Sequence, residues 1–212
     1  IAEAVGTPFY AYSHKTLVRH FRVFDGAFKD LPHLTCFAVK ANSNLAILRL
    51  FVEEGGGVDI VSGGELYRAL QAGVDPRKIV YSGVYKGAGD IADAVEMQAG
   101  IYTAESIHQA ELLQMEAAKR DTVLPVLLRL NAGSQFGMSR EDLYYIFSNM
   151  DQFRNLQIEG IHFFAGTQRK KIAQQEKELQ MLKELFEQIH IQYGFVLKKL
   201  EYGPGLPVPY FT

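Results

Sequence analysis

The stretch CFAVKANSN, residues 36–44, ends a short apolar run with a single lysine. Residues 36–39 have the composition of a buried β-strand, and residues 41–44 that of the turn that leaves it. We therefore expect Lys40 at the mouth of a dry strand, where an ammonium group is costly to keep charged. Such a lysine becomes a nucleophile toward an aldehyde. The alternative is a strand-end lysine that simply reaches solvent.

Six further short runs of β-branched and aromatic residues follow this one. The seven predicted strands cover residues 37–40, 58–62, 79–82, 101–103, 123–130, 158–164 and 197–202. Amphipathic segments, clearest at residues 13–30, 139–150 and 170–194, lie before or between them, and Gly73, Gly100 and Gly194 are predicted to end helices.

Strands that alternate with helices predict parallel βα units, and two closures of such a sheet are possible. One is an open doubly wound sheet, and the other is a (β/α)8 TIM-type barrel. No G-x-G-x-x-G motif follows the first strand, which disfavours the dinucleotide-binding form of the open sheet. The fold class is therefore α/β, and the barrel is the prediction. No eighth strand is visible after residue 202, so we expect the barrel to lack its last strand in this chain.

The composition of the 212 residues is that of one globular domain, which we take as residues 1–212. The formal net charge is -2 and no run of Lys or Arg is present, so no nucleic-acid partner is expected. No apolar stretch reaches the roughly 20 residues that span a bilayer, so no membrane association is expected. The single cysteine, Cys36, is predicted to be a small core residue and fits a cytoplasmic location. The first residue is not Met, so the chain reads as a trimmed one.

Polar residues and glycines gather at the predicted strand ends. Asp59 and Glu65 accompany the second strand, Arg129 lies near the end of the fifth, and GIHFFAGTQ and EYGPGL close the sixth and seventh. Each has a simpler structural explanation, but in a barrel all would meet at one rim, where active sites form. A lysine, an aromatic ring and small loops suit an aldehyde cofactor that carries a phosphate. The GPG segment follows the seventh strand, where barrels commonly bind phosphate.

Four motifs carry a family resemblance: FAVKANSNLAILRLF, GVDIVSGGELYRALQAGVDPRKIVYSGVYK, FGM and GIHFFAGTQ. With them the chain, from about Thr7 onward, resembles the N-terminal barrel of the fold-type III decarboxylases that depend on pyridoxal 5'-phosphate (PLP). These share the barrel of alanine racemase, and the diaminopimelate decarboxylases are the most similar group. The resemblance implies decarboxylation of a small-molecule amino-acid substrate, a homodimer in the full-length form, and no metal. It also implies a Schiff base between PLP and Lys40, with the other cofactor-binding residues being Asp59, Glu65, Arg129, Phe164, Gly166, Thr167, Gly203 and Gly205.

The chain departs from this family at several positions. Phe164 stands where the family has a histidine stacked on the cofactor ring, and Pro204 interrupts a turn that usually has three glycines. His162 lies two residues before Phe164 and is expected to be a core residue. The loop at residues 131–137 is short, and the family's eighth strand and C-terminal β-domain have no counterpart in this sequence. An amino-acid racemase, a related PLP lyase and a PLP-binding barrel without turnover therefore remain alternatives.

Overall fold

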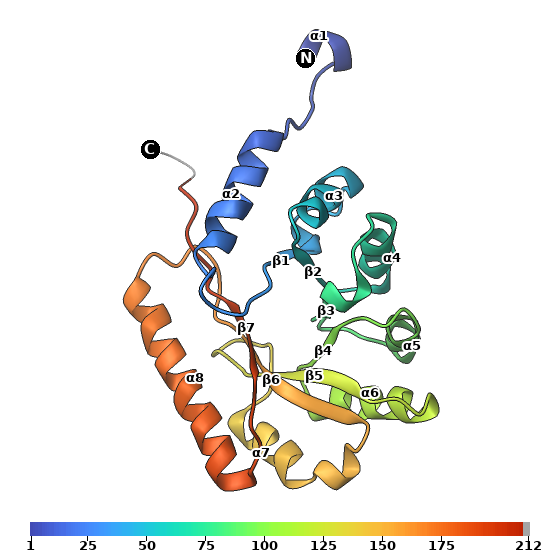
Figure 1. The fold of residues 1–212 in the computed structure, drawn as a ribbon, viewed down its shortest axis with the longest axis vertical. Helices are drawn as coiled ribbons and strands as arrows, with labels where there is room; N and C mark the ends of the chain where they lie inside the picture. Colours follow the sequence, from blue (N-terminus) through green and yellow to red (C-terminus); the bar gives the residue numbers. More distant parts are fainter. Residues whose placement is uncertain (210–212) are drawn as a thin grey trace.

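The computed structural model describes residues 1–209, in which seven parallel strands form one sheet (Figure 1). The strands are β1 (Cys36–Ala38), β2 (Gly57–Ile60), β3 (Ile79–Tyr81), β4 (Ile101–Ala104), β5 (Leu124–Arg129), β6 (Leu156–Phe164) and β7 (Lys199–Gly203). They pair in chain order from β1 to β7. This is the strand order of a barrel, whereas a doubly wound sheet reverses direction at a switch point. The predicted barrel-type α/β class is confirmed, with β1 and β7 as the two edges of the sheet.

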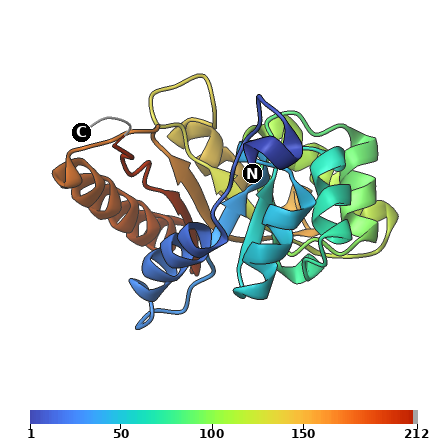
Figure 2. The same ribbon diagram turned by 90° about the horizontal axis from the view of Figure 1, so that it is seen from above.

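Most of the helices lie on the outer side of this curled sheet (Figures 1 and 2), whereas the first helix projects away from it (Figure 1). The α-helices are α1 (Ala2–Val5), α2 (His14–Gly26), α3 (Leu45–Glu53), α4 (Gly63–Gln71), α5 (Ala88–Glu96), α6 (Ile107–Lys119), α7 (Arg140–Ser148) and α8 (Ile172–Tyr193). Three short 3-10 turns are η1 (Val39–Ala41), η2 (Pro76–Lys78) and η3 (Met150–Gln152). In the part of the chain that the structure describes, no helix combines the length and apolarity needed to cross a membrane.

Polar side chains cap several of the helices that follow strands. Asn44 accepts from the backbone N–H of Ala46, Ser62 from that of Glu65, and Ser106 from that of Gln109. Each cap satisfies a backbone donor that the first helical turn leaves free. The carboxyl ends of the parallel strands open onto one rim. The connection from strand to helix is short after β2 and β4 and longer after β5 and β6.

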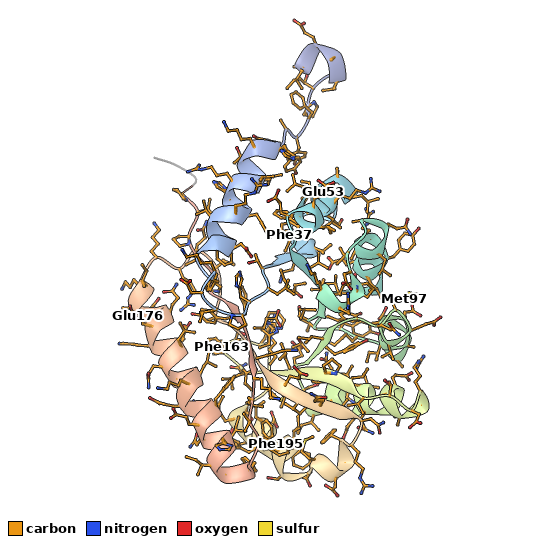
Figure 3. All side chains as sticks on the ribbon, in the orientation of Figure 1. Phe37, Glu53, Met97, Phe163, Glu176 and Phe195 are labelled. Carbon is orange, nitrogen blue, oxygen red and sulfur yellow. The ribbon has the colours of Figure 1, made fainter. Side chains whose placement is uncertain are left out.

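The main apolar core lies between the sheet and its helices. Phe163 on β6 is buried and stacks on Tyr202 of β7, with ring centroids 6.4 Å apart. In Figure 3 this ring lies at the centre of the molecule, whereas Met97 and Glu176 lie at its periphery. Because successive residues of a strand face opposite sides, Phe163 faces the helix layer and its neighbour Phe164 faces the other side.

The predicted helix stops hold at two glycines and fail at the third. Gly194 caps α8 in the left-handed region with φ 76°, and Gly73 follows α4 with φ 86°. After α5 the left-handed residue is Gln98, so Gly100 does not end that helix. A Cβ at Gly100 would lie 2.1 Å from the carbonyl oxygen of Arg77. Gly100 is therefore required by a close approach of two chain segments.

Candidate cofactor site

Lys40 does not lie at the end of a dry strand. Strand β1 ends at Ala38, and Lys40 is the middle residue of the 3-10 turn η1, with an exposed side chain. Its Nζ lies 5.8 Å from the centroid of the Phe164 ring at the end of β6. The prediction that burial activates this amine is wrong for the structure described. The amine is accessible instead, and it faces an aromatic ring across the rim.

Asp59 lies on β2 and pairs in register with Ala38 of β1, two residues before Lys40. Ser82 donates a hydrogen bond from its hydroxyl to Asp59 Oδ1. Burial raises the pKa of Asp59, while the Ser82 bond and then the nearby charge of Lys40 act in the opposite direction. The site therefore holds a partly buried carboxyl group close to the accessible amine.

Glu65 has a local structural partner. Its carboxylate accepts a 2.7 Å hydrogen bond from the backbone N–H of Val61, and its own N–H donates to the Ser62 hydroxyl. These bonds fix the turn between β2 and α4. A role for Glu65 toward a cofactor stays a prediction.

Arg129 forms a buried ion pair with a residue that sequence reasoning missed. The Arg129 side chain is at the end of β5, where the residue is 8% exposed, and its Nη1 donates to Glu105 Oε2 at 2.9 Å. The guanidinium also lies 5.1 Å from the centroid of the Phe136 ring. Glu105 directly follows β4, so the strand-end argument applied to Asp59 and Glu65 would have found it.

The turn after β7 leaves no space for side chains on the side of Phe164. Gly203 pairs in register with Phe164, and a Cβ on Gly203 would lie 2.5 Å from that ring. Gly205 has φ 62°, and a Cβ there would lie 2.0 Å from the carbonyl oxygen of Gly166. Both positions therefore require glycine. Thr167 follows Gly166 in the same loop and is exposed.

A buried lysine side chain, which the sequence predicted at Lys40, is present at another position. Lys86 follows β3 by five residues, is 3% exposed, and donates from Nζ to the carbonyl oxygen of Gly83. Burial lowers its pKa to about 8. Lys86 lies at the end of the quoted motif GVDIVSGGELYRALQAGVDPRKIVYSGVYK, but the sequence did not distinguish it from a surface lysine.

Two more ionisable residues fill the interior below the rim. His162 is 7% exposed, as expected for a core histidine, and pairs in register with both Arg129 and Glu201. Burial first, and then the Arg129 charge, lower the pKa of His162 to about 3. Glu201 was missed, although it lies two residues before Gly203 and hence on the same side of β7.

A barrel-type sheet with an accessible amine, an aromatic ring and a glycine turn at its carboxyl rim is typical of α/β barrels that bind a phosphorylated aldehyde cofactor. Residues 14–212 match a family model described as the pyridoxal-dependent decarboxylase, pyridoxal binding domain. The chain belongs to this family. The predicted family and its cofactor, PLP, are thereby confirmed.

Individual relatives agree with this assignment. Diaminopimelate decarboxylase of Haemophilus influenzae is 35% identical over 225 residues, and that of Pseudomonas aeruginosa is 34% identical; each comparison covers 99% of this chain and 54% of the relative. The chain thus spans about half the length of these curated relatives.

Solved structures show the same relationship. A diaminopimelate decarboxylase from M. jannaschii in co-complex with L-lysine has a TM-score of 0.93 at 26% identity, covering 100% of this chain and 54% of that one. The Helicobacter pylori enzyme complexed with L-lysine has a TM-score of 0.92 at 28% identity, covering 98% and 56%.

The residues present fit PLP. Gly203 and Gly205 stand where a Cβ would collide with the Phe164 ring and the Gly166 carbonyl oxygen, and backbone without side chains lets N–H groups approach a phosphate. The exposed amine of Lys40 can reach an aldehyde carbon, and Phe164 offers a ring surface beside it.

Proposed function

We propose that this domain holds PLP for the decarboxylation of an amino acid, with Lys40 as the point of covalent attachment. One observation carries the proposal: Lys40 Nζ lies 5.8 Å from the Phe164 ring, and that ring packs against Gly203. An amine, a ring and a glycine-containing turn are therefore contiguous. In PLP the aldehyde and the phosphate arm are attached to neighbouring carbons of one aromatic ring, so an amine, a stacking surface and a phosphate-binding turn that lie close together suit this cofactor.

The remaining site residues divide the work of binding. Gly166, Thr167, Gly203 and Gly205 would hold the phosphate, and Phe164 would orient the ring and exclude water from one of its faces. Asp59 keeps a carboxyl group near the amine, and the buried Arg129 fixes the interior beneath it. Bound PLP supplies an electron sink for breaking a bond next to the substrate's amino nitrogen.

The substrate class, the assembly and the location belong to the same proposal. The curated relatives are diaminopimelate decarboxylases, and the two solved structures described above hold L-lysine, which supports an amino acid as the substrate. We propose a homodimer of the full-length protein, in which the barrel of residues 1–212 is completed by an eighth strand and a β-domain. A cytoplasmic location is supported by the free thiol of Cys36.

Phe164 also supports a second candidate, a PLP-binding barrel without turnover. A phenylalanine ring can stack, but it neither donates a conventional hydrogen bond nor carries charge. Release of CO2 from a panel of amino acids by the full-length protein would support the decarboxylase. Loss of α-proton chirality without CO2 would support a racemase, and PLP binding with neither reaction would support the non-catalytic barrel.

The attachment point is tested by borohydride reduction of the full-length protein incubated with PLP, followed by peptide mass mapping. The two lysines to compare are Lys40, which is exposed, and Lys86, which is buried. We expect a pyridoxyl group on the Lys40 peptide in the wild type and in Lys86→Met, and none at this position in a folded Lys40→Ala variant. An adduct on Lys86, or a Schiff-base absorbance that persists in Lys40→Ala, would overturn the assignment.

A further inference from the structure

Three segments meet behind the glycine turn: the loop after β6, the turn after β7, and the second turn of α8. Arg169 in the loop donates from Nη1 and Nη2 to the two carboxylate oxygens of Glu178 on α8, with Nη1 2.9 Å from Oε2. The hydroxyl of Tyr202 donates to the same Oε2 at 2.8 Å. The Arg169 and Glu178 side chains are 11% and 19% exposed, so the pair is held in a confined position.

Arg169 also binds the turn itself. Its backbone N–H donates to the carbonyl oxygen of Gly205 at 2.8 Å, and its Nη1 donates to that of Pro204 at 3.3 Å. These two carbonyls belong to successive trans peptide groups. In a planar trans peptide the N–H points away from the C=O. The N–H groups of Gly205 and Leu206 therefore point away from the Arg169 contacts, and within residues 1–209 neither donates to another group.

We propose that Arg169 is a positioning residue of the phosphate site, which holds the Pro204 and Gly205 carbonyls so that the N–H groups of Gly205 and Leu206 face the phosphate. This inference rests on the proposed function, because it needs a phosphorylated cofactor. Pro204 has no N–H, so the turn offers fewer donors than a turn of three glycines. The orientation of the donors that remain then matters more for phosphate binding.

Geometry, and not charge, is the property of Arg169 that this role requires. Glu178 neutralises the guanidinium, so Arg169 acts on the phosphate through the backbone of the turn. A lysine would keep the charge at this position but would lose the two-pronged contact with Glu178. The side chain would then no longer be fixed beneath Pro204.

The test compares PLP with pyridoxal, which lacks the phosphate, by measuring the dissociation constant of each from the full-length protein. The variants are Arg169→Met, Arg169→Lys and Glu178→Gln. The matched control is Arg154→Met, because Arg154 is an exposed arginine that also donates to a backbone carbonyl, that of Asp151. Thermal unfolding of every variant without cofactor reports whether the fold is preserved.

We expect Arg169→Met and Arg169→Lys to weaken PLP binding about tenfold, or about 1.4 kcal/mol, and pyridoxal binding less than about twofold. Glu178→Gln should change the ratio of the PLP and pyridoxal dissociation constants in the same direction by a smaller factor. If the Arg169 variants do not fold, this variant provides the test. An unchanged ratio in these variants would overturn the inference, as would a wild-type ratio in Arg169→Lys. A wild-type protein that shows no preference for PLP over pyridoxal would instead contradict the proposed function, and the inference with it.

Discussion

His162 and Glu201 face each other across β6 and β7, with His162 Nδ1 3.5 Å from Glu201 Oε2. Both atoms are inaccessible to solvent, and neither has a well-aligned hydrogen-bond partner among the residues described. Burial shifts the two pKa values in opposite directions, to about 3 for His162 and to about 8 for Glu201. At neutral pH both side chains are therefore neutral, in an interior that also holds Arg129, Lys86 and Asp59.

Replacing His162 with glutamine is expected to make folding less sensitive to acid. The folded histidine stays neutral down to about pH 3, whereas the unfolded one gains a proton below its ordinary pKa of 6.5. The unfolded state binds more protons between these values, so the wild type loses stability as the pH falls from 6.5 to 3. The loss attributable to this group is at most about 1.4 kcal/mol per pH unit.

Urea unfolding of the full-length protein at several pH values between 7.5 and 4 measures this slope. His108→Gln is the matched control, because His108 is an exposed histidine on α6. A His162→Gln slope equal to that of the wild type would show that His162 titrates normally in the folded protein.

Replacing Glu201 with glutamine is expected to change stability in the opposite pH direction from His162→Gln, with an effect that grows as the pH rises. Burial, followed by the nearby charge of Asp59, raises the pKa of Glu201 to about 8 from an ordinary value of 4.5. The folded state then binds more protons between pH 4.5 and 8, so wild-type stability falls as the pH rises through this range. Glutamine does not ionise, so the free energy of unfolding of the variant should rise relative to that of the wild type as the pH increases to about 8. Urea titrations from pH 5 to 8.5 check this, with the exposed Glu141→Gln as control; parallel curves for wild type and Glu201→Gln would contradict it.

The barrel order of the strands could be predicted because each strand is a short apolar run and each intervening helix shows its own periodicity. The position of Lys40 relative to β1 could not, because an apolar run does not reveal where the ladder of backbone hydrogen bonds ends. Val39 is apolar and fully buried, yet it already belongs to the 3-10 turn. The strand ends at Ala38, before Lys40, and the amine is exposed.

The site was predictable where a residue lies directly on a strand end, as Asp59, Arg129 and Phe164 do. Alternation along β7 would also have indicated Glu201. Lys86 and Arg169 lie in loops, where the side chains do not follow the regular alternation of a strand or the repeat of a helix, so their positions cannot be inferred from spacing. The partners of Arg169 are Glu178 on α8 and the turn at Pro204, and only the folded chain brings these together.

Two glycines in the left-handed region allow backbone strain to be separated from close contact. Gly205 has φ 62° and Gly133 has φ 84°, so an alanine at either position pays about 1–2 kcal/mol for its backbone conformation. Only at Gly205 would the new Cβ meet another group, the carbonyl oxygen of Gly166, whereas nothing lies within 4 Å at Gly133. We expect Gly205→Ala to be the more destabilising change, and the only one of the two that weakens PLP binding. Denaturant unfolding and PLP titration measure both effects, and equal losses in the two variants would contradict the close contact.

The identity of residue 164 offers a last test, of whether the ring surface or its hydrogen-bonding capacity holds the cofactor. Phe164 lies over Gly203 and faces Lys40, and both contacts are made by the surface of its aromatic ring. We therefore expect Phe164→His to retain PLP, because an aromatic surface remains. Phe164→Leu should bind it more weakly by about 0.5–1.5 kcal/mol, the usual worth of a ring pair.

The measurement is a PLP titration of both variants beside Phe28→Leu, which removes an exposed ring from the segment between α2 and β1. A Phe164→His protein that folds but binds no PLP would contradict stacking as the basis of binding. Equal affinities for Phe164→Leu and the wild type would do the same. If instead the histidine variant binds PLP and also releases CO2 faster than the wild type, then Phe164 limits turnover without limiting binding. That result would separate the binding role of this rim from its catalytic one.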